Sequence, residues 1–253
     1  MSETKIYFAS DQHLGIPNKK QSFEREKKVL RWLNYIRKDA TELFLLGDLF
    51  DFWFEYNKVV PKGYVRILGK LAEITDQGIP IHFFVGNHDL WVKDYFTQEL
   101  GISVYRNPTD FVREGKKFHI AHGDGLGPKD KGYKFMKKIF SNGLCQWLFH
   151  WLIHPNLGIG LGQYLSKSKT VISGHRAPKF MGPSKEWLVQ YAKQKQVESH
   201  RDYYVFGHRH LPLEINIDEK ATYMNIGDWI THFSYAVFDG QQLTLKYWKE
   251  DSK

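Results

Sequence analysis

The sequence predicts an α/β fold whose candidate site lies on the rim where the strands end. Two observations support this. Apolar runs typical of strands alternate with segments of helical spacing in the N-terminal part of the chain. Five strand-like runs, spread along the chain, are each followed directly by carboxylate, amide or imidazole side chains. Because ligands of open α/β sheets bind outside the carboxyl ends of the strands, we expect these side chains to meet at one edge.

The N-terminal part predicts repeated strand, polar turn and helix units. Strand-like runs cover Lys5 to Ser10, Glu42 to Leu46 and Ile79 to Val85. Apolar residues at helical spacing cover Phe23 to Lys38 and Tyr64 to Gln77. Alternation of this kind is typical of an α/β sheet, so we expect these strands to be neighbours in it.

Shorter strand-like runs follow in the middle of the chain. They are Ile102 to Tyr105, Asp110 to Arg113 and Phe118 to Ala121. The residues from Glu114 to Lys117, between the last two runs, predict a hairpin turn.

From residue 132 to residue 200 the pattern changes, and we expect a helical lid inserted into one core formed by residues 1–131 and 201–253. Met136 to Leu152 is an apolar stripe with helical spacing, and Glu186 to Gln196 predicts another helix. The stripe either packs on the core or forms a groove for acyl chains. Its apolar residues and the lysines from Lys129 to Lys138 fit an anionic membrane surface, although a solvated basic face is the alternative.

The C-terminal part predicts an all-strand segment. A clear hairpin turn falls at Asp239-Gly240. The strand-like runs are Tyr203 to Phe206, Leu213 to Ile217, Tyr223 to Ile226, Phe233 to Phe238 and Gln242 to Trp248.

Composition narrows the class of partner. The chain has 253 residues, 42% of them hydrophobic and 16% aromatic, with a formal net charge of +8, which attracts anions. No basic helix, zinc finger or stacking motif accompanies the charge, so nucleic acid is the weaker interpretation. The single cysteine, Cys145, and the polar N-terminus without a signal peptide predict a cytoplasmic protein. Leu144 to Ile153 is too short to span a bilayer.

The polar clusters supply the ligands of a two-metal site. Two divalent ions roughly 3.5–4 Å apart can clamp the attacking and leaving oxygens of a phosphoryl displacement. One Asp or His in a loop is usually only a turn residue, but five clusters after five strands predict a shared site. Nitrogen and oxygen ligands without a thiolate suit manganese, iron or zinc better than calcium. The candidate ligands are Asp11, His13, Asp48, Asn87, His122, His208 and His210.

The motif series DxH, GDxxD, GNHD, HGD and GHxH resembles that of the calcineurin-like metallophosphoesterase superfamily across almost the whole predicted core. The resemblance implies a sandwich of two mixed β-sheets flanked by helices. It implies one metal ion on Asp11, His13, Asp48 and His210, and a second on Asp48, Asn87, His122 and His208. Asp48 would bridge the two ions, and His88 would lie beside the phosphate, to stabilise the transition state or protonate the leaving oxygen.

Longer stretches, GDLFDFW, HGDGLGPKDKGY and GHRHLP, resemble the UDP-2,3-diacylglucosamine pyrophosphohydrolases of lipid A biosynthesis. That resemblance implies hydrolysis of UDP-2,3-diacylglucosamine to UMP and 2,3-diacylglucosamine 1-phosphate (lipid X), with manganese as the usual metal. It also implies a peripheral location on the cytoplasmic face of the inner membrane and a lid over the acyl chains. Expected substrate contacts are Asn87, His88, His208, Asp130 at the glucosamine unit, and a lid lysine, Lys179 or Lys185, of which we take Lys185.

One position departs from this narrower pattern. His88 stands where these enzymes typically carry arginine, and the two side chains are not interchangeable because arginine has a permanent charge and a bidentate fork. Two alternatives therefore stay open. One is a metallophosphodiesterase acting on another nucleotide or phosphodiester, and the other is a lipid-binding protein with an idle metal site.

Overall fold

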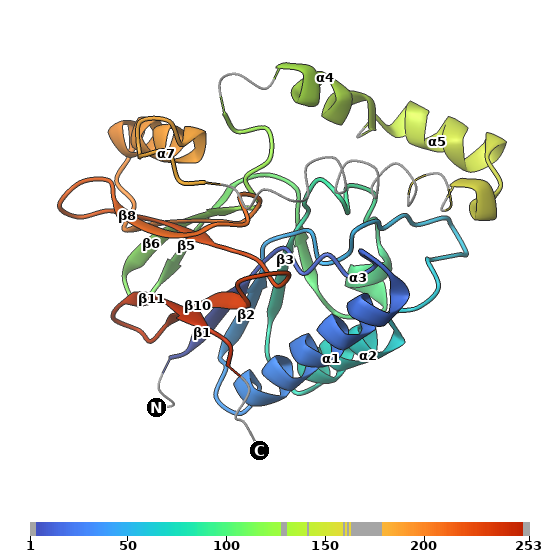
Figure 1. Cartoon of the computed structure of the whole chain (residues 1–253), viewed down its shortest axis with the longest axis horizontal. Coiled ribbons are helices and arrows are strands. Elements are labelled where there is room, and N and C mark those ends of the chain that lie inside the picture. Colours follow the sequence, from blue (N-terminus) through green and yellow to red (C-terminus); the bar gives the residue numbers. More distant parts are fainter. Residues whose placement is uncertain are drawn as a thin grey trace.

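Two β-sheets stacked face to face form the centre of the protein (Figure 1). The computed structural model describes residues 4–127, 131–140, 142–158, 160, 162 and 179–249. The first sheet has the strand order β11-β10-β1-β2-β3-β4, and the second has the order β5-β6-β7-β9-β8. The chain thus has the sandwich of two sheets that the family resemblance implies.

The first sheet contains the three N-terminal strands that the sequence predicts, in parallel. β1, β2, β3 and β4 run parallel to one another, whereas β10 pairs antiparallel with β1 and β11 antiparallel with β10. Its strands are β1 (Ile6–Ala9), β2 (Glu42–Leu45), β3 (Ile81–Phe84), β4 (Ser103–Tyr105), β10 (Ser234–Phe238) and β11 (Leu243–Tyr247).

The second sheet is also mixed. β6, β7 and β9 are parallel, and the edge strands β5 and β8 are antiparallel to them. The turn between β5 and β6 is shorter than predicted: Glu114 and Gly115, with φ of 48° and 72°, form it, and Lys116 already pairs with Arg113. The strands are β5 (Thr109–Arg113), β6 (Lys116–Ala121), β7 (Tyr203–Phe206), β8 (Pro212–Asn216) and β9 (Thr222–Ile226).

Helices cover the outer faces of both sheets. α1 (Lys19–Ile36), α2 (Val65–Asp76) and the short α3 (Tyr95–Gln98) lie on the first sheet, and α7 (Trp187–Glu198) lies on the second (Figure 1). α1 begins four residues before the predicted start, because the Asn18 side chain accepts a hydrogen bond from the Gln21 amide and caps the helix.

Alternating side chains of the strands divide the core into layers. Phe8 and Phe44 point between the sheets, where their rings stack 5.0 Å apart and Phe8 stacks on Phe118 of the second sheet. Tyr7 and Leu43 point the other way, into the cluster that α1 and α2 cover. Because successive side chains point to opposite faces, each strand packs on the other sheet through one face and on the helices through the other. This packing positions the loops at the rim of the sheets.

Helices of the predicted lid segment differ in their packing. The apolar stripe is divided into α4 (Lys131–Phe140) and α5 (Gly143–Leu152), because the Asn142 side chain accepts from the amides of Leu144 and Cys145 and starts a new helix. α7 packs against the second sheet in a buried cluster. The domain division stays a prediction. Among the helices that the structure describes, none combines the length and apolar character needed to cross a bilayer.

Candidate metal centre

The rim where β1 and β2 end is built by loops that continue the pairing of the strands. The amide of Asp11 donates to the carbonyl of Gly47, and the amide of His13 donates to that of Asp48, so the two loops stay side by side beyond the sheet. From the second sheet, the amide of Gly207, after β7, donates to the carbonyl of His122, after β6. The amide of His208 donates to Asp11 Oδ2 and so joins the two loop pairs at one edge of the molecule.

Backbone conformation turns the candidate ligands inward. Asp11, His13, Asp48, His208 and His210 all have positive φ, between 43° and 66°. Residues other than glycine rarely adopt this left-handed conformation, and such strain concentrates at functional sites. The surrounding sheets hold these five residues in it, which indicates a constructed site rather than a surface loop.

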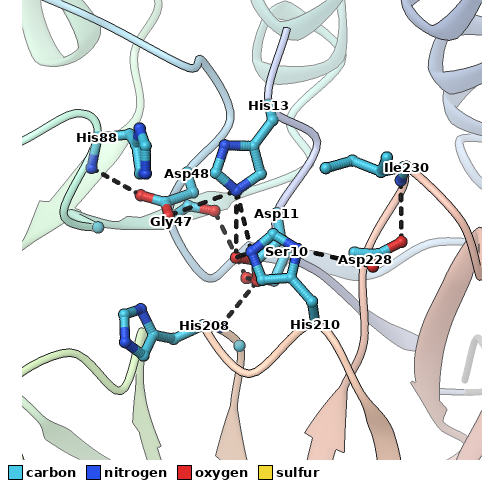
Figure 2. Close-up of polar contacts among 12 residues, drawn as sticks. Ser10, Asp11, His13, Gly47, Asp48, His88, His208, His210, Asp228 and Ile230 are labelled. Carbon is cyan, nitrogen blue, oxygen red and sulfur yellow. Dashed lines mark hydrogen bonds and ion pairs between the residues drawn. The ribbon is translucent and has the colours of Figure 1, made fainter. Parts of the chain in front are cut away.

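One group of candidate ligands consists of Asp11, His13 and His210. Asp11 Oδ1 lies 3.1 Å from His210 Nε2 and 3.6 Å from His13 Nε2, and the two imidazole nitrogens are 3.2 Å apart. Figure 2 shows the three side chains turned toward one another. Burial opposes charge here, but the Asp11 carboxylate raises the pKa of His210 to about 10.

A second group consists of Asp48, Asn87, His122 and His208. His122 Nε2 lies 3.3 Å from Asp48 Oδ2, 3.2 Å from Asn87 Oδ1 and 3.3 Å from His208 Nδ1. The same Asp48 oxygen is 3.6 Å from His13 Nε2 of the first group. Asp48 therefore stands between the two groups and touches both.

The electrostatics of the centre favour bound positive charge. Burial alone would raise the pKa of the Asp48 carboxyl, but the imidazoles of His122 and His88 hold it well below its usual range. Burial would lower the pKa of His122, yet Asp48 raises it to about 10. Burial and then the charge of His122 lower the pKa of His208 to about 4. Buried carboxylates that stay ionised in this way are suited to cations.

The donor set fits two divalent metal ions. Ligand atoms that bind one ion at about 2.0–2.2 Å lie roughly 2.8–3.6 Å from one another in tetrahedral or octahedral geometry. The separations of 3.1–3.6 Å within each group match that range. Imidazole nitrogens together with carboxylate and amide oxygens are a donor set for Mn, Fe or Zn.

A layer of hydrogen bonds orients the candidate ligands. Asp11 Oδ2 accepts from the hydroxyl of Ser10 at 2.5 Å and from the amide of His208 at 2.9 Å. His122 Nδ1 lies 2.5 Å from the carbonyl of Leu46, which places its proton there and leaves Nε2 facing the centre. Such partners fix ring orientation and tautomer in metal sites.

Two residues of this supporting layer are absent from our sequence predictions. Asp228 Oδ2 lies 3.6 Å from His210 Nδ1, while its Oδ1 accepts from the amide of Ile230 at 2.9 Å (Figure 2). Asp89 is fully buried and accepts from the amides of Gly86 and Leu49, and burial raises its pKa to about 8. Gly227-Asp228 directly follows β9, so the same strand-end signal could have identified Asp228.

His88 lies at the edge of the centre. Its amide donates to Asp48 Oδ1 at 2.9 Å, and its ring sits edge-on to the His13 ring with centroids 4.7 Å apart. Nδ1 is 2.8 Å from the carbonyl oxygen of Asp51, an acceptor, so the Nδ1 proton points there. The Asp48 and Asp51 contacts thus fix the position of His88.

The remaining predicted substrate contacts are Lys185 and Asp130. Lys185 is exposed in the turn before α7, where its amide donates to the carbonyl of Gly182, and the structure shows no side-chain contact between it and the candidate ligands. Asp130 lies outside the described residues.

An aromatic cluster joins α5 to the loops beside His88. The Phe54 ring packs on Trp91 at 4.0 Å and on Phe149 of α5 at 5.1 Å, and the Tyr56 hydroxyl donates to the carbonyl of Ile153. We call Phe54, Tyr56, Trp91 and Phe149 the aromatic cluster. α4 is tied to the core differently, because Lys137 Nζ lies 2.6 Å from the buried carboxylate of Asp124.

Comparison with known proteins gives one family. A family model for calcineurin-like phosphoesterases matches residues 4–212. A UDP-2,3-diacylglucosamine hydrolase of Porphyromonas gingivalis is 38% identical over 96% of this chain and 97% of its own length. One of Edwardsiella ictaluri is 25% identical over 94% and 90%. Among solved structures, a Thermus thermophilus protein matches 97% of this chain and 99% of its own length at 11% identity, with a TM-score of 0.49.

Proposed function

Because the chain belongs to the calcineurin-like phosphoesterase family and is a metal-dependent hydrolase, we propose that it hydrolyses the pyrophosphate of UDP-2,3-diacylglucosamine. The products are UMP and 2,3-diacylglucosamine 1-phosphate, lipid X. The observation that carries this proposal is the 38% identity, over nearly the whole of both chains, with a relative that bears the name of this hydrolase.

We assign the ligands to two divalent metal ions, with manganese as the proposed metal and iron or zinc as chemical alternatives. Asp11, His13 and His210 hold one ion and Asn87, His122 and His208 the other, with Asp48 shared, an assignment that the distances within and between the groups support. Such ions supply charge that polarises the phosphoryl oxygens and stabilises charge developing at phosphorus.

The chain's own contribution to the reaction centres on Asn87 and His88. Asn87 orients its amide oxygen toward His122 and so belongs to the ligand shell. Nδ1 of His88 is directed at a carbonyl, so Nε2 is the ring nitrogen assigned to the phosphate. We propose that it either donates a hydrogen bond that stabilises the transition state or passes a proton to the leaving oxygen.

Further substrate contacts follow from the same proposal. His208 lies in the ligand shell, where a phosphate oxygen bound at the centre comes within its reach. We propose that Asp130 meets the glucosamine unit and that Lys185 approaches a phosphate from the turn before α7.

The acyl chains and the membrane are assigned to the lid side of the centre. The aromatic cluster offers an apolar wall beside His88, and the outer side of α5 exposes Trp147, Trp151 and Leu152. Contiguous exposed apolar side chains mark interaction surfaces. We propose that this face binds the anionic cytoplasmic surface of the inner membrane, where the lipid substrate resides.

A second candidate function keeps the metal centre and changes the substrate. His88 in place of the arginine typical of the lipid enzymes favours a nucleotide or other phosphodiester as substrate. The third candidate function is a lipid-binding protein with an inactive metal centre. The candidate metal ligands lie close together in groups, which argues against an inactive centre.

Product analysis tests the proposal. Purified protein is incubated with manganese and UDP-2,3-diacylglucosamine, and the products are separated by chromatography. UMP and lipid X in equal amounts support the proposal. A substrate left intact under conditions in which a soluble phosphodiester is cleaved contradicts it, and faster turnover of a soluble nucleotide than of the lipid establishes the second candidate.

A further inference from the structure

A cavity of about 350 Å³ lies directly beside the metal centre. The ends of β3 and β4 from the first sheet and of β6 from the second form its walls, and α4 contributes to its rim. Phe84, Val85, Tyr105 and Ala121 give it apolar walls. Its volume is at the lower end of the roughly 300–1,000 Å³ of small-molecule sites, which suits one group of nucleoside size.

The rim of the cavity is strongly basic. Arg106, Lys134, Lys137 and Lys138 line it, whereas Asp124 is the one carboxylate among the lining residues that the structure describes. Lys137 pairs with Asp124, and the Arg106 guanidinium donates to backbone carbonyls of the loop after β3. Lys134 and Lys138 pair with no carboxylate in the part of the chain that the structure describes. The rim therefore attracts an anionic ligand.

His122 connects this cavity to the chemistry, because it lines the cavity and also contacts Asp48 and Asn87. A group covalently attached to a phosphate at the centre can therefore extend into the cavity. The aromatic cluster offers an apolar wall for the acyl chains elsewhere, since Phe54, Tyr56, Trp91 and Phe149 do not line the cavity. The two halves of a nucleotide-linked lipid thus have separate places.

We propose that the cavity binds the uridine nucleotide half of the substrate, an inference that rests on the proposed function and deepens it. Its apolar walls take the base and ribose, and Lys134 and Lys138 face the phosphate. Asn107, also at the rim, carries both a donor and an acceptor in its amide, which complement the N3–H and the O4 carbonyl of uracil.

Direct binding of UMP to the manganese-loaded protein, measured by titration calorimetry, tests the lysines. The double variant Lys134→Ala/Lys138→Ala should bind UMP about five- to tenfold more weakly, because two unpaired cations are lost near its phosphate. Its KM for the UDP-lipid should rise by a similar factor with kcat little changed. Lys193→Ala/Lys246→Ala, which removes two exposed lysines from α7 and β11, is the matched control.

Asn107→Ala tests the choice of base. It should reduce the preference for UMP over inorganic phosphate about fivefold while inorganic phosphate binds as before, since one good hydrogen bond is worth roughly that factor. Circular dichroism of each variant establishes that it is folded. UMP binding equal to wild type in folded versions of both variants overturns the assignment.

The two proposals fail in different ways. If the UDP-lipid is hydrolysed and the lysine variant matches wild type in UMP affinity and in KM, the cavity assignment is wrong and the proposed reaction stands. If the UDP-lipid is not hydrolysed but UMP binding weakens in the lysine and Asn107 variants alone, the cavity is a uridine nucleotide site and the proposed substrate is wrong.

Discussion

Asp48 is the residue on which the two halves of the metal centre converge, because one of its oxygens lies within 3.6 Å of imidazoles from both groups. Asp48→Asn keeps the shape but replaces one carboxylate oxygen by an amide that binds cations poorly. We expect turnover to fall by more than about 100-fold and metal content to fall as well. Steady-state kinetics and elemental analysis of the purified variant measure the two effects.

Asp76→Asn is the matched control for that change, since Asp76 is exposed at the end of α2 and the same substitution there alters charge without touching the centre. It should keep wild-type turnover. Unchanged turnover in Asp48→Asn contradicts the assignment of Asp48 as the shared ligand, and with it the proposed reaction at this centre.

His88 can be separated from the metal ligands by the kinetic constants. His88→Ala removes the ring whose Nδ1 contacts the Asp51 carbonyl, while the backbone amide that donates to Asp48 remains. We expect kcat for the UDP-lipid to fall about 100-fold, the scale of a lost general acid, with metal content unchanged. His200→Ala, at an exposed histidine outside the centre, should leave kcat as it is. A normal kcat in His88→Ala excludes a role for this ring in catalysis.

The candidate ligands could be predicted from the sequence because each follows an apolar run within four residues, and the ends of such runs meet at one rim. His208 and His210 lie far along the chain from Asp11, yet the order of strands brings them within contact. Asp228 has the same strand-end position but stands outside the quoted motifs. The buried role of Asp89 depends on two amides that no residue pattern reveals.

At the scale of elements, the capping of α1 offers a test of how local sequence sets a boundary. Asn18 accepts from the Gln21 amide at 3.0 Å, and its loss in Asn18→Ala should reduce the free energy of unfolding by about 1 kcal/mol. Urea denaturation measures it.

Asn34→Ala makes the same change inside the same helix, at an exposed position where alanine is the better helix former, and should be neutral or slightly stabilising. Equal destabilisation by both variants contradicts a capping role for Asn18.

Boundaries were the least predictable feature of the elements. Polar residues from Lys19 to Ser22 hide the first turn of α1, so periodicity placed its start at Phe23. Asn142-Gly143 divides the apolar stripe between α4 and α5, a break that spacing alone does not show because the stripe continues on both sides. The short α3 has too few residues for a period. By contrast, the boundaries predicted for the parallel strands agree with the structure to within two residues.

At the scale of the whole molecule, the packing of the two sheets holds the metal centre together, since Asp11, Asp48 and Asn87 come from one sheet and His122 and His208 from the other. The mixed character of the sheets was implied only by the family resemblance. The pairing of β10 with β1 was not predicted, because strand order joins segments far apart in the chain.

Phe44 tests this packing. It is 1% exposed between the sheets, where it stacks on Phe8 and meets Phe111 edge-on. Phe44→Ala should lower the free energy of unfolding by about 3–5 kcal/mol, because a buried ring leaves a cavity. Val112→Ala, at a 57% exposed position of β5, should change it little. Denaturant unfolding of both variants measures the change. If Phe44→Ala lowers the free energy of unfolding by less than about 1 kcal/mol, the packing described is wrong.

The membrane proposal also concerns the whole molecule, because the exposed face of α5 and the net charge of +8 act together. The proposal began with the lysines of α4, but Lys137 pairs with Asp124. We therefore expect apolar side chains to supply most of the affinity for the membrane. Trp147 and Trp151 are 54% and 76% exposed. Each tryptophan buried in the bilayer interface contributes about 1.5–3 kcal/mol.

Trp147→Ser/Trp151→Ser should therefore reduce binding to vesicles that contain anionic lipid by more than about tenfold, measured by flotation. Val65→Ser, at a 75% exposed apolar residue on α2, is the control and should bind like wild type. Raising salt to about 0.5 M should weaken wild-type binding only in part, because screening removes the charge contribution and leaves the apolar one. If the tryptophan variant floats with vesicles as wild type does, α5 is not the face that meets the membrane.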